Sequence, residues 1–343
     1  MKFDFAIGNP PYQEDNENSV RKSPVYNSFM DAAYTIAHTV ELITPGRFLF
    51  DAGQTPKAWN EKMLNNEHFK VLHYEKDATK IFANTEIKGG IIISLHDSGR
   101  TFGKISVFTP YDELNHIYQK VSKKCPVNNR LDSIVSQRGM YRLSDKFFTD
   151  FPHTSGRLGT GTGNMIVSNI FDKLPEAFLI EKPNDGYKYI EIFGRAGNAR
   201  VYRFIKEEYV LKNEFLDKYK LFFPEANSNG QFGEVLTLPA VGKPHQGATD
   251  TFLNIGLFNS KAEAEALLKY IKSKFMRALL GVKKVTQHTP KPVWDTIPMQ
   301  DFTDKSDIDW SKSIKEIDQQ LYKKYNLSDE EIEFIETKVK EME

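Results

Sequence analysis

Residues 3–12 read FDFAIGNPPY, a short apolar run that stops at Asn-Pro-Pro-Tyr. Adjacent prolines lack backbone donors, so this tetrapeptide continues neither a helix nor an inner strand. The pattern predicts a strand over residues 3–7 that ends in a rigid turn. Because ligands of open α/β sheets bind beyond the carboxyl ends of the strands, this turn marks a candidate binding site.

Helices and strands alternate after this stretch. The sequence predicts helices over residues 25–38 and 55–66, and strands over residues 40–50, 69–77 and 89–97. In the second of these helices, Thr55 is expected to cap the first turn and Pro56 to take the first helical position. The alternation is typical of an α/β fold with a mainly parallel sheet.

The second half of the chain has a different pattern. Residues 187–205 read as two strands around a glycine-containing turn, which predicts a hairpin. Ser260 with Glu263, and Ser328 with Glu331, have the spacing of capping boxes and predict two helix starts. We therefore expect a mixed α/β region followed by a helical end.

Composition limits the class of protein. The chain has 343 residues, enough for two domains, and its 46 basic and 46 acidic residues give no net charge. Cys125 is the single cysteine, so an internal disulfide and a thiolate zinc cluster are excluded. The histidines also lack the spacing of metal ligands, and we therefore expect no metal site. No run of 18 apolar residues occurs, so we expect a soluble, cytoplasmic protein without a membrane partner.

The tetrapeptide suits the recognition of an amine. An exocyclic amine such as N6 of adenine offers two N–H donors, which the Asn9 Oδ1 and the Pro10 carbonyl can accept, while Pro11 helps to fix the backbone. Tyr12 offers a face for base stacking, worth about 1–3 kcal/mol per base. Such a base has to leave the duplex, so the chemistry requires base flipping. The alternative is a plain turn without function.

These residues resemble motif IV of the amino-methyltransferases that use S-adenosylmethionine. Further stretches extend the resemblance to adenine-specific (N6) DNA methyltransferases of type II restriction–modification systems: YNSFMDAA (26–33), LITPGRFL (42–49), IFANTEIKGGIIISL (81–95) and, in the target-recognition region, residues 257–294. The resemblance implies that Asn9, Pro10, Pro11 and Tyr12 are catalytic. It also implies that a later aromatic residue, by position Phe82, packs against the flipped adenine.

The resemblance also implies a domain plan. Residues 1–120 are expected to form a partial Rossmann-like methyltransferase sheet, residues 121–300 a mixed α/β target-recognition domain, and residues 301–343 a helical tail. In the family, a glycine-rich loop and an acidic strand end before motif IV bind S-adenosylmethionine. Downstream, the glycine clusters at residues 155–164 and 193–200 lack a leading apolar strand or a following acidic strand end. We therefore expect an incomplete donor site, with the missing strands supplied by an upstream polypeptide.

Double-stranded DNA is the partner that the resemblance implies, and clustered basic and polar residues are the expected contacts. They are Arg195, Arg200, Arg203, Lys274, Arg277, Lys283, Lys284 and Gln287. Two alternatives stay open. One is a catalytically inactive DNA-binding or specificity subunit, and the other is a protein-glutamine or RNA methyltransferase, families that share Asn-Pro-Pro-Tyr.

Overall fold

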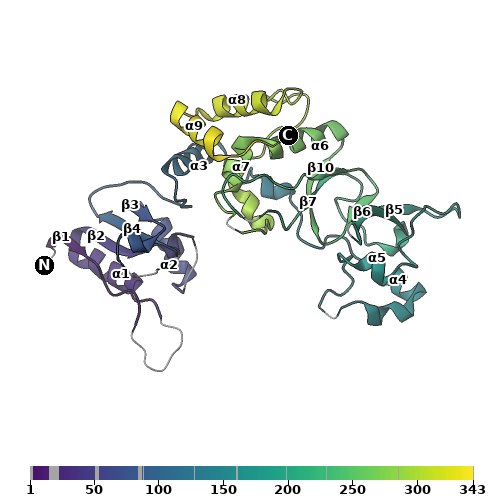
Figure 1. The fold of residues 1–343 in the computed structure, drawn as a ribbon, viewed down its shortest axis with the longest axis horizontal. Coiled ribbons are helices and arrows are strands. Elements are labelled where there is room, and N and C mark those ends of the chain that lie inside the picture. The colour runs from purple at the N-terminus through teal and green to yellow at the C-terminus, as the bar shows by residue number, and fades with distance from the viewer. Residues whose placement is uncertain are drawn as a thin grey trace. The chain divides into compact units, whose positions relative to one another are not determined.

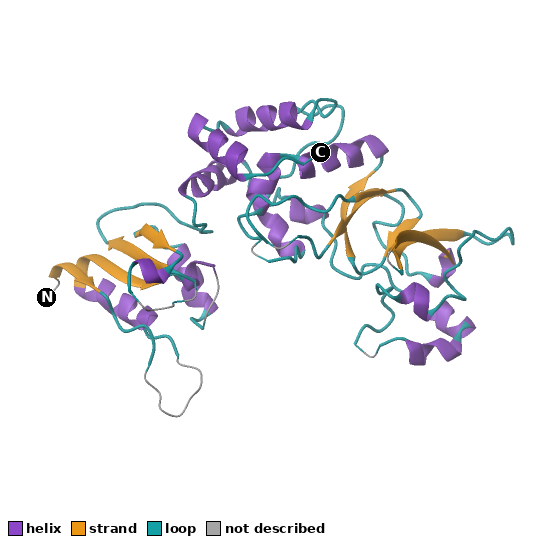
Figure 2. Ribbon diagram, viewed as in Figure 1, coloured by secondary structure: helices purple, strands orange, loops and turns teal. Residues whose placement is uncertain are grey.

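The chain forms two compact units, Met1–Asn115 and His116–Glu343. The computed structural model describes residues 3–14, 23–50, 54–83, 87, 89–126, 128–159, 161–197, 199–228, 230–284 and 286–342. Both units combine strands and helices (Figures 1 and 2), so the chain is a mixed α/β protein, as the sequence predicts. Along the described part of the chain, no helix is long and apolar enough to cross a membrane.

A four-stranded sheet is the centre of the first unit. Its strands are β1 (Phe3–Gly8), β2 (Ala37–Pro45), β3 (Phe69–Glu75) and β4 (Ile91–Asp97). They lie in the order β1-β2-β4-β3, with β1 parallel to β2 and β4 antiparallel to both of its neighbours. Consequently β1, β2 and β3 point the same way and only β4 is reversed.

The reversal of β4 departs from the expected mainly parallel sheet. Parallel neighbours need a crossover of about a dozen or more residues, usually an α-helix. The described part of the connection between β3 and β4 contains only the short 3-10 helix η2 (Ala78–Lys80). Without a crossover helix, β4 returns beside β3 as an antiparallel neighbour and fills the position between β2 and β3.

Helices cover one face of this sheet. They are α1 (Tyr26–Ile36), the 3-10 helix η1 (Arg47–Phe50) and α2 (Lys57–Leu64). Tyr26, Trp59 and Met63 from these helices pack with Val40 of β2 and Phe69 of β3 in one apolar core.

The predicted cap of α2 is wrong in detail. Pro56, not Thr55, occupies the N-cap. The Thr55 hydroxyl instead donates to Asn60 Oδ1 at 2.7 Å, a tertiary contact that the local pattern does not show.

The other face of β1 is open. Phe3, Phe5 and Ile7 alternate along the strand, and 59%, 70% and 80% of their surfaces are exposed. Sheets with parallel strands are normally covered on both faces, so this row of large apolar side chains is unusual. Among the described residues, β1 pairs only with β2 and leaves its second edge unpaired.

The second unit contains two three-stranded sheets, ordered β6-β5-β9 and β10-β7-β8. The strands are β5 (Tyr189–Ala196), β6 (Ala199–Lys206), β7 (Tyr219–Pro224), β8 (Ala240–Gly242), β9 (Gln246–Ala248) and β10 (Phe252–Phe258). The α-helices are α3 (Asp112–Lys124), which begins before the unit boundary, α4 (Asp145–Asp150), α5 (Ile170–Lys173), α6 (Lys261–Lys272), α7 (Lys274–Leu280), α8 (Ile314–Tyr325) and α9 (Asp329–Lys338). The 3-10 helices are η3 (Leu131–Ile134), η4 (Pro152–Arg157), η5 (Glu207–Tyr209) and η6 (Lys291–Thr296).

Local signals predict several of these elements correctly. The β5–β6 hairpin forms as expected, and both predicted capping boxes are present, at the starts of α6 and α9. A third capping box, Ser313 with Glu316, starts α8. Its spacing is the same, so the sequence also contains the signal for this helix.

The helix that begins after Ser260 breaks at Ser273 instead of running on to Leu280. The Asp318 carboxylate accepts hydrogen bonds from the Lys274 and Phe275 amides at 3.0 and 2.9 Å, and so caps a new helix there. The Ser273 hydroxyl also accepts from the Met276 amide at 3.2 Å, so the new helix start combines a local cap with a side chain that is distant in the sequence.

Candidate functional site

The tetrapeptide Asn9–Tyr12 begins where the parallel strands β1 and β2 end. Gly8 is the last residue of β1 and lies beside Leu42 of β2. Asn9 therefore emerges next to the end of β2, at the carboxyl edge of both strands, and its side chain is exposed. This is the position at which the sequence predicts a ligand site.

Two backbone contacts hold the far end of the tetrapeptide. The Tyr12 carbonyl accepts a hydrogen bond from the Val25 amide at 3.2 Å, and Gln13 forms a bridge with Pro24. The Tyr12 ring also packs against the apolar core of the first unit. The turn is thus fixed between β1 on one side and the entry to α1 on the other.

Asn9 and Tyr12 lie close together at this turn. The Tyr12 hydroxyl is buried and has no hydrogen bond of normal geometry. Burial raises the pKa of Tyr12, and the nearby Asn9 side chain offsets part of that rise. Tyr12 is therefore a neutral phenol at neutral pH, and its ring is suited to stacking rather than to proton transfer.

The end of β2 is tied to the start of β4. The Gly46 amide donates to the Gly90 carbonyl at 2.9 Å. Gly90 has φ +71°, and a Cβ there would lie 2.6 Å from the Glu75 carbonyl oxygen, so only glycine fits.

Phe82 follows η2, where its amide donates to the Ala78 carbonyl at 2.8 Å. Its contact with a flipped base remains a prediction.

The two glycine clusters of the described residues do not fit a binding site for the methyl donor S-adenosylmethionine. The first glycine cluster follows the 3-10 helix η4 in the second unit, and the second cluster turns the β5–β6 hairpin. Neither connects a strand to a helix, the arrangement in which backbone amides cradle a nucleotide-like ligand. In the described parts of the chain, no group of three or more His, Cys, Asp or Glu side chains could hold a metal ion.

Comparison with known proteins finds a family that is similar to part of the first unit. Residues 1–82 match the Eco57I restriction-modification methylase family. The predicted resemblance to adenine methylases of restriction–modification systems is therefore confirmed.

Two individual proteins are also similar. An uncharacterized adenine-specific methylase of Mycoplasma pneumoniae (strain ATCC 29342 / M129 / Subtype 1) is 30% identical over 95 residues, which are 26% of this chain and 22% of that protein. The type IIG restriction endonuclease BpuSI aligns with 87% of this chain at 11% identity and a TM-score of 0.31. The aligned part is 44% of the BpuSI chain, so the present chain spans less than half the length of either protein.

The three predicted arginines of the hairpin do not form one cluster. Arg195 and Arg200 lie directly opposite each other on β5 and β6, so both side chains project from the same face, and both are exposed. Arg203 is an odd number of residues from Arg200 and projects from the opposite face. Its guanidinium lies over the Phe171 ring, 5.9 Å from the ring centre.

Three other predicted DNA contacts make ion pairs or hydrogen bonds within the second unit, and two of them are buried. Lys274 Nζ binds the Glu336 carboxylate at 2.6 Å. Arg277 is buried, and its NH1 and NH2 groups donate to the backbone carbonyls of Glu234 and Lys340 at 3.2 and 2.5 Å. Lys284 is buried and paired with Glu234. Arg277 and Lys284 are therefore shielded from a phosphate, whereas Lys274 is partly exposed but already paired.

Lys283 and Gln287 stay at the surface. Lys283 Nζ pairs with Asp295 at 2.6 Å, yet about a third of the Lys283 side chain is exposed. Gln287 is exposed, and its backbone carbonyl accepts from the Asn227 amide at 2.7 Å, which holds this segment in place. Both residues remain predicted DNA contacts.

Proposed function

We propose that this chain is the adenine-binding part of a site-specific DNA adenine N6-methyltransferase of a restriction–modification system. One observation carries the proposal: Asn9–Tyr12 is a rigid turn at the carboxyl end of β1, within the segment that matches the methylase family. S-adenosylmethionine is the methyl donor that the family implies.

The turn binds and orients the amine. The Asn9 side-chain oxygen and the Pro10 carbonyl accept the two N–H groups of adenine N6, which raises the electron density on this nitrogen and leaves its lone pair out of the base plane for attack on the methyl group. Tyr12, and by prediction Phe82, hold the flipped base by stacking. No residue has to remove a proton first, since the amine loses its proton only after the new N–C bond has formed.

The open side of β1 is the proposed docking edge for the donor-binding strands. β1 has an unpaired edge among the described residues, and the row Phe3, Phe5 and Ile7 is exposed beside it. An upstream polypeptide whose outermost strand runs parallel to β1, and whose helices cover this row, would complete the sheet. We therefore propose that donor binding needs that polypeptide.

The second unit is the proposed reader of duplex DNA. Arg195 and Arg200 face each other on an exposed hairpin, where they place two positive charges on the same face. A two-stranded ribbon fits the major groove, where phosphates lie on either side. Lys283 and Gln287 are the further proposed contacts.

Calorimetric titration of the chain with S-adenosylmethionine, with and without duplex DNA, tests the proposal. We expect no donor binding by the chain alone, and methyl transfer to adenine only when the upstream polypeptide is present. In that complex, Asn9→Ala should abolish methyl transfer while DNA binding is kept. Asn65→Ala changes an exposed asparagine at the end of α2 and is the matched control. Full activity in the Asn9→Ala complex would overturn the assignment of Asn9.

An inactive DNA-binding or specificity subunit is the second candidate function. It is favoured by the lack of a strand–loop–helix donor site among the described residues. DNA binding without donor binding or methyl transfer, even with the upstream polypeptide added, would select this alternative.

A further inference from the structure

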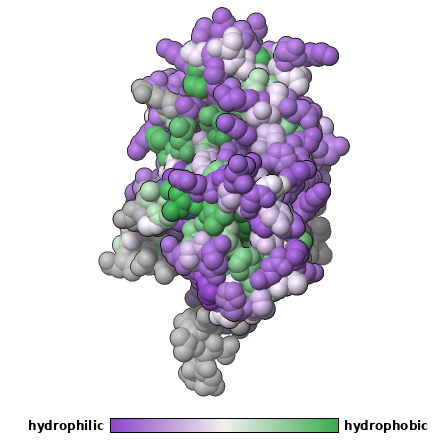
Figure 3. All heavy atoms as spheres, turned by 90° about the vertical axis from the view of Figure 1, so that its right-hand side faces the viewer, coloured by the Kyte–Doolittle hydropathy of each residue, from purple (hydrophilic) through white to green (hydrophobic). Residues whose placement is uncertain are grey.

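A cavity of about 680 Å³ lies beneath the β5–β6 hairpin of the second unit. Its lining combines a guanidinium (Arg203), two carboxylates (Asp172 and Glu181) and the apolar side chains of Phe171 and Ile180. Figure 3 shows apolar side chains gathered in patches among hydrophilic ones on the face that contains this hairpin in Figure 1. The cavity is open to solvent, since Asp172, Ile180 and Glu181 are exposed, and its volume lies in the range of small-molecule sites.

The walls of the cavity are fixed. Gly194 of β5 lets the Phe171 ring approach the sheet, since a Cβ at this position would lie 2.7 Å from the Phe171 ring. Leu179 and Phe204 exchange two backbone hydrogen bonds of 2.8 Å, which attach the loop after α5 to the edge of β6. The site is therefore preorganised before any ligand enters.

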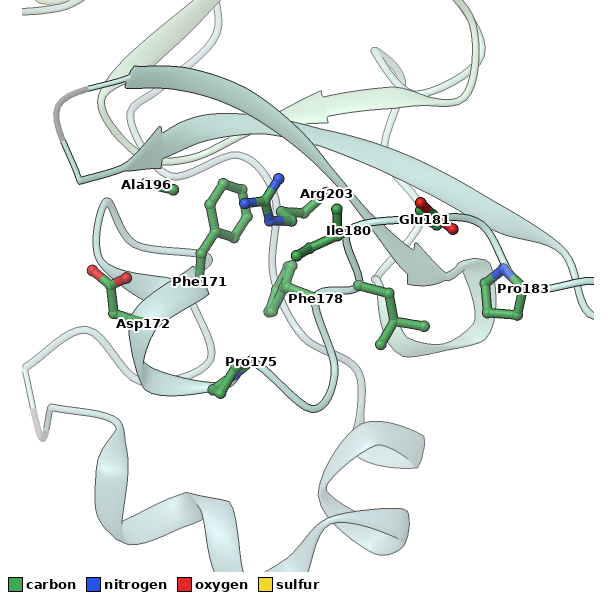
Figure 4. Close-up of a pocket in the computed structure, with 10 residues that line it drawn as sticks. Phe171, Asp172, Pro175, Phe178, Ile180, Glu181, Pro183, Ala196 and Arg203 are labelled. Carbon is green, nitrogen blue, oxygen red and sulfur yellow. The ribbon is translucent and has the colours of Figure 1, made fainter.

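The guanidinium of Arg203 is also held in place. Arg203 NH1 donates to the Tyr202 carbonyl at 3.1 Å, and the guanidinium lies above Phe171 (Figure 4). Asp172 projects from α5 toward the hairpin near Ala196 (Figure 4). The cavity thus presents a planar donor on one side and a planar acceptor on the other.

We infer that this cavity binds a guanine base. Guanine has two adjacent acceptors, O6 and N7, which match the forked donors of Arg203, and two adjacent donors, N1–H and N2–H, which match the Asp172 carboxylate. The carboxylates Asp172 and Glu181 repel phosphate, so the base enters while its phosphates stay outside. Ile180, 72% exposed, is the apolar side chain that the base covers.

The inference rests on the proposed function, because it assumes that the second unit meets DNA. It goes further by assigning a second base pocket, separate from the one at Asn9–Tyr12. Arg195 and Arg200 lie on the opposite face of the hairpin. A guanine outside the duplex stack is the ligand of this pocket.

Titration of the full chain with guanosine, adenosine and cytidine 5′-monophosphates tests the inference. The Asn9→Ala background removes binding at the adenine turn. We expect guanosine monophosphate to bind about tenfold more tightly than the other two, and Asp172→Asn or Arg203→Gln to remove that preference. The matched controls are Asp145→Asn, at an exposed aspartate at the start of α4, and Arg142→Gln, at an exposed arginine of the same unit. Both control variants should keep the preference for guanosine monophosphate.

Equal binding of the three nucleotides, no binding of guanosine monophosphate, or a preference that survives both substitutions would overturn the inference. Duplex binding by the same chain separates this failure from that of the proposed function. If duplex DNA binds but guanosine monophosphate does not, only the guanine pocket is wrong. If neither binds, the proposed DNA-reading role of the second unit is wrong as well.

Discussion

Two neighbouring lysines should respond very differently to the same substitution. Lys284 is 4% exposed and pairs with the Glu234 carboxylate, which is also shielded and accepts from the Gly230 amide at 3.1 Å. Lys283 pairs with Asp295, but the two side chains are 35% and 37% exposed. The first pair is inside the protein and the second is in contact with water.

The expected losses of stability follow from this difference. Lys284→Met leaves a buried carboxylate without its cation, which costs about 3–5 kcal/mol in free energy of unfolding. Lys283→Met breaks a solvated pair, which costs about 0–1 kcal/mol. For a unit of this size, each kcal/mol lowers Tm by about 2–4 °C, so Lys284→Met should lower Tm by about 6–20 °C and Lys283→Met by at most about 4 °C.

Urea and thermal unfolding of the full chain, followed by circular dichroism, measure both losses. A third variant, Lys284→Met with Glu234→Gln, removes the orphaned charge and should recover part of the lost stability. Equal losses in the two single variants, or no recovery in the double variant, would refute the conclusion that Lys284 is a structural cation.

Three further predictions concern charge and packing. Burial raises the pKa of Asp318 from 3.8 to about 6, so its protonated form favours folding. As pH rises from about 3 to 7, the free energy of unfolding of the wild type should fall by about 3 kcal/mol relative to Asp318→Asn, which urea titrations across this range measure. Arg195→Gln and Arg200→Gln should each reduce the slope of log K against log salt for duplex DNA by about 1, and an unchanged slope would remove the hairpin from the interface. Gly194→Ala places a Cβ 2.7 Å from Phe171 and should cost about 1–3 kcal/mol of stability in thermal unfolding, whereas unchanged stability would show that the ring can move away.

The order of strands illustrates the limit of local patterns. Apolar runs and turn residues locate all four strands of the first unit, because a strand's composition is set by its own faces. The direction of β4 depends on how the chain closes after β3, and periodicity contains no information on that closure. The mainly parallel sheet is therefore an incorrect expectation. Two boundaries also differ, because β2 begins inside the predicted helix 25–38 and the predicted strand 40–50 ends in η1.

The basic residues show the same limit more sharply. Lys283 and Lys284 are adjacent in the sequence, and both are predicted DNA contacts. The carboxylate that pairs with Lys284 belongs to Glu234, which is fifty positions away. Arg203 was grouped with Arg195 and Arg200 by proximity, while the period of two along a strand puts it on the opposite face. Once the hairpin is predicted, the sequence alone therefore indicates that Arg203 projects from the other face than Arg195 and Arg200.

The sequence by itself determined the rigid turn Asn9–Tyr12, the hairpin and the capped helix starts, because prolines, glycines and capping side chains act on a backbone only a few residues away. Only the tertiary structure decided which cations are buried, which distant carboxylate binds the first amides of α7, and where a cavity opens beneath the hairpin. These features arise when residues far apart in the chain come into contact, and burial then fixes whether a charge is a ligand contact or part of the core.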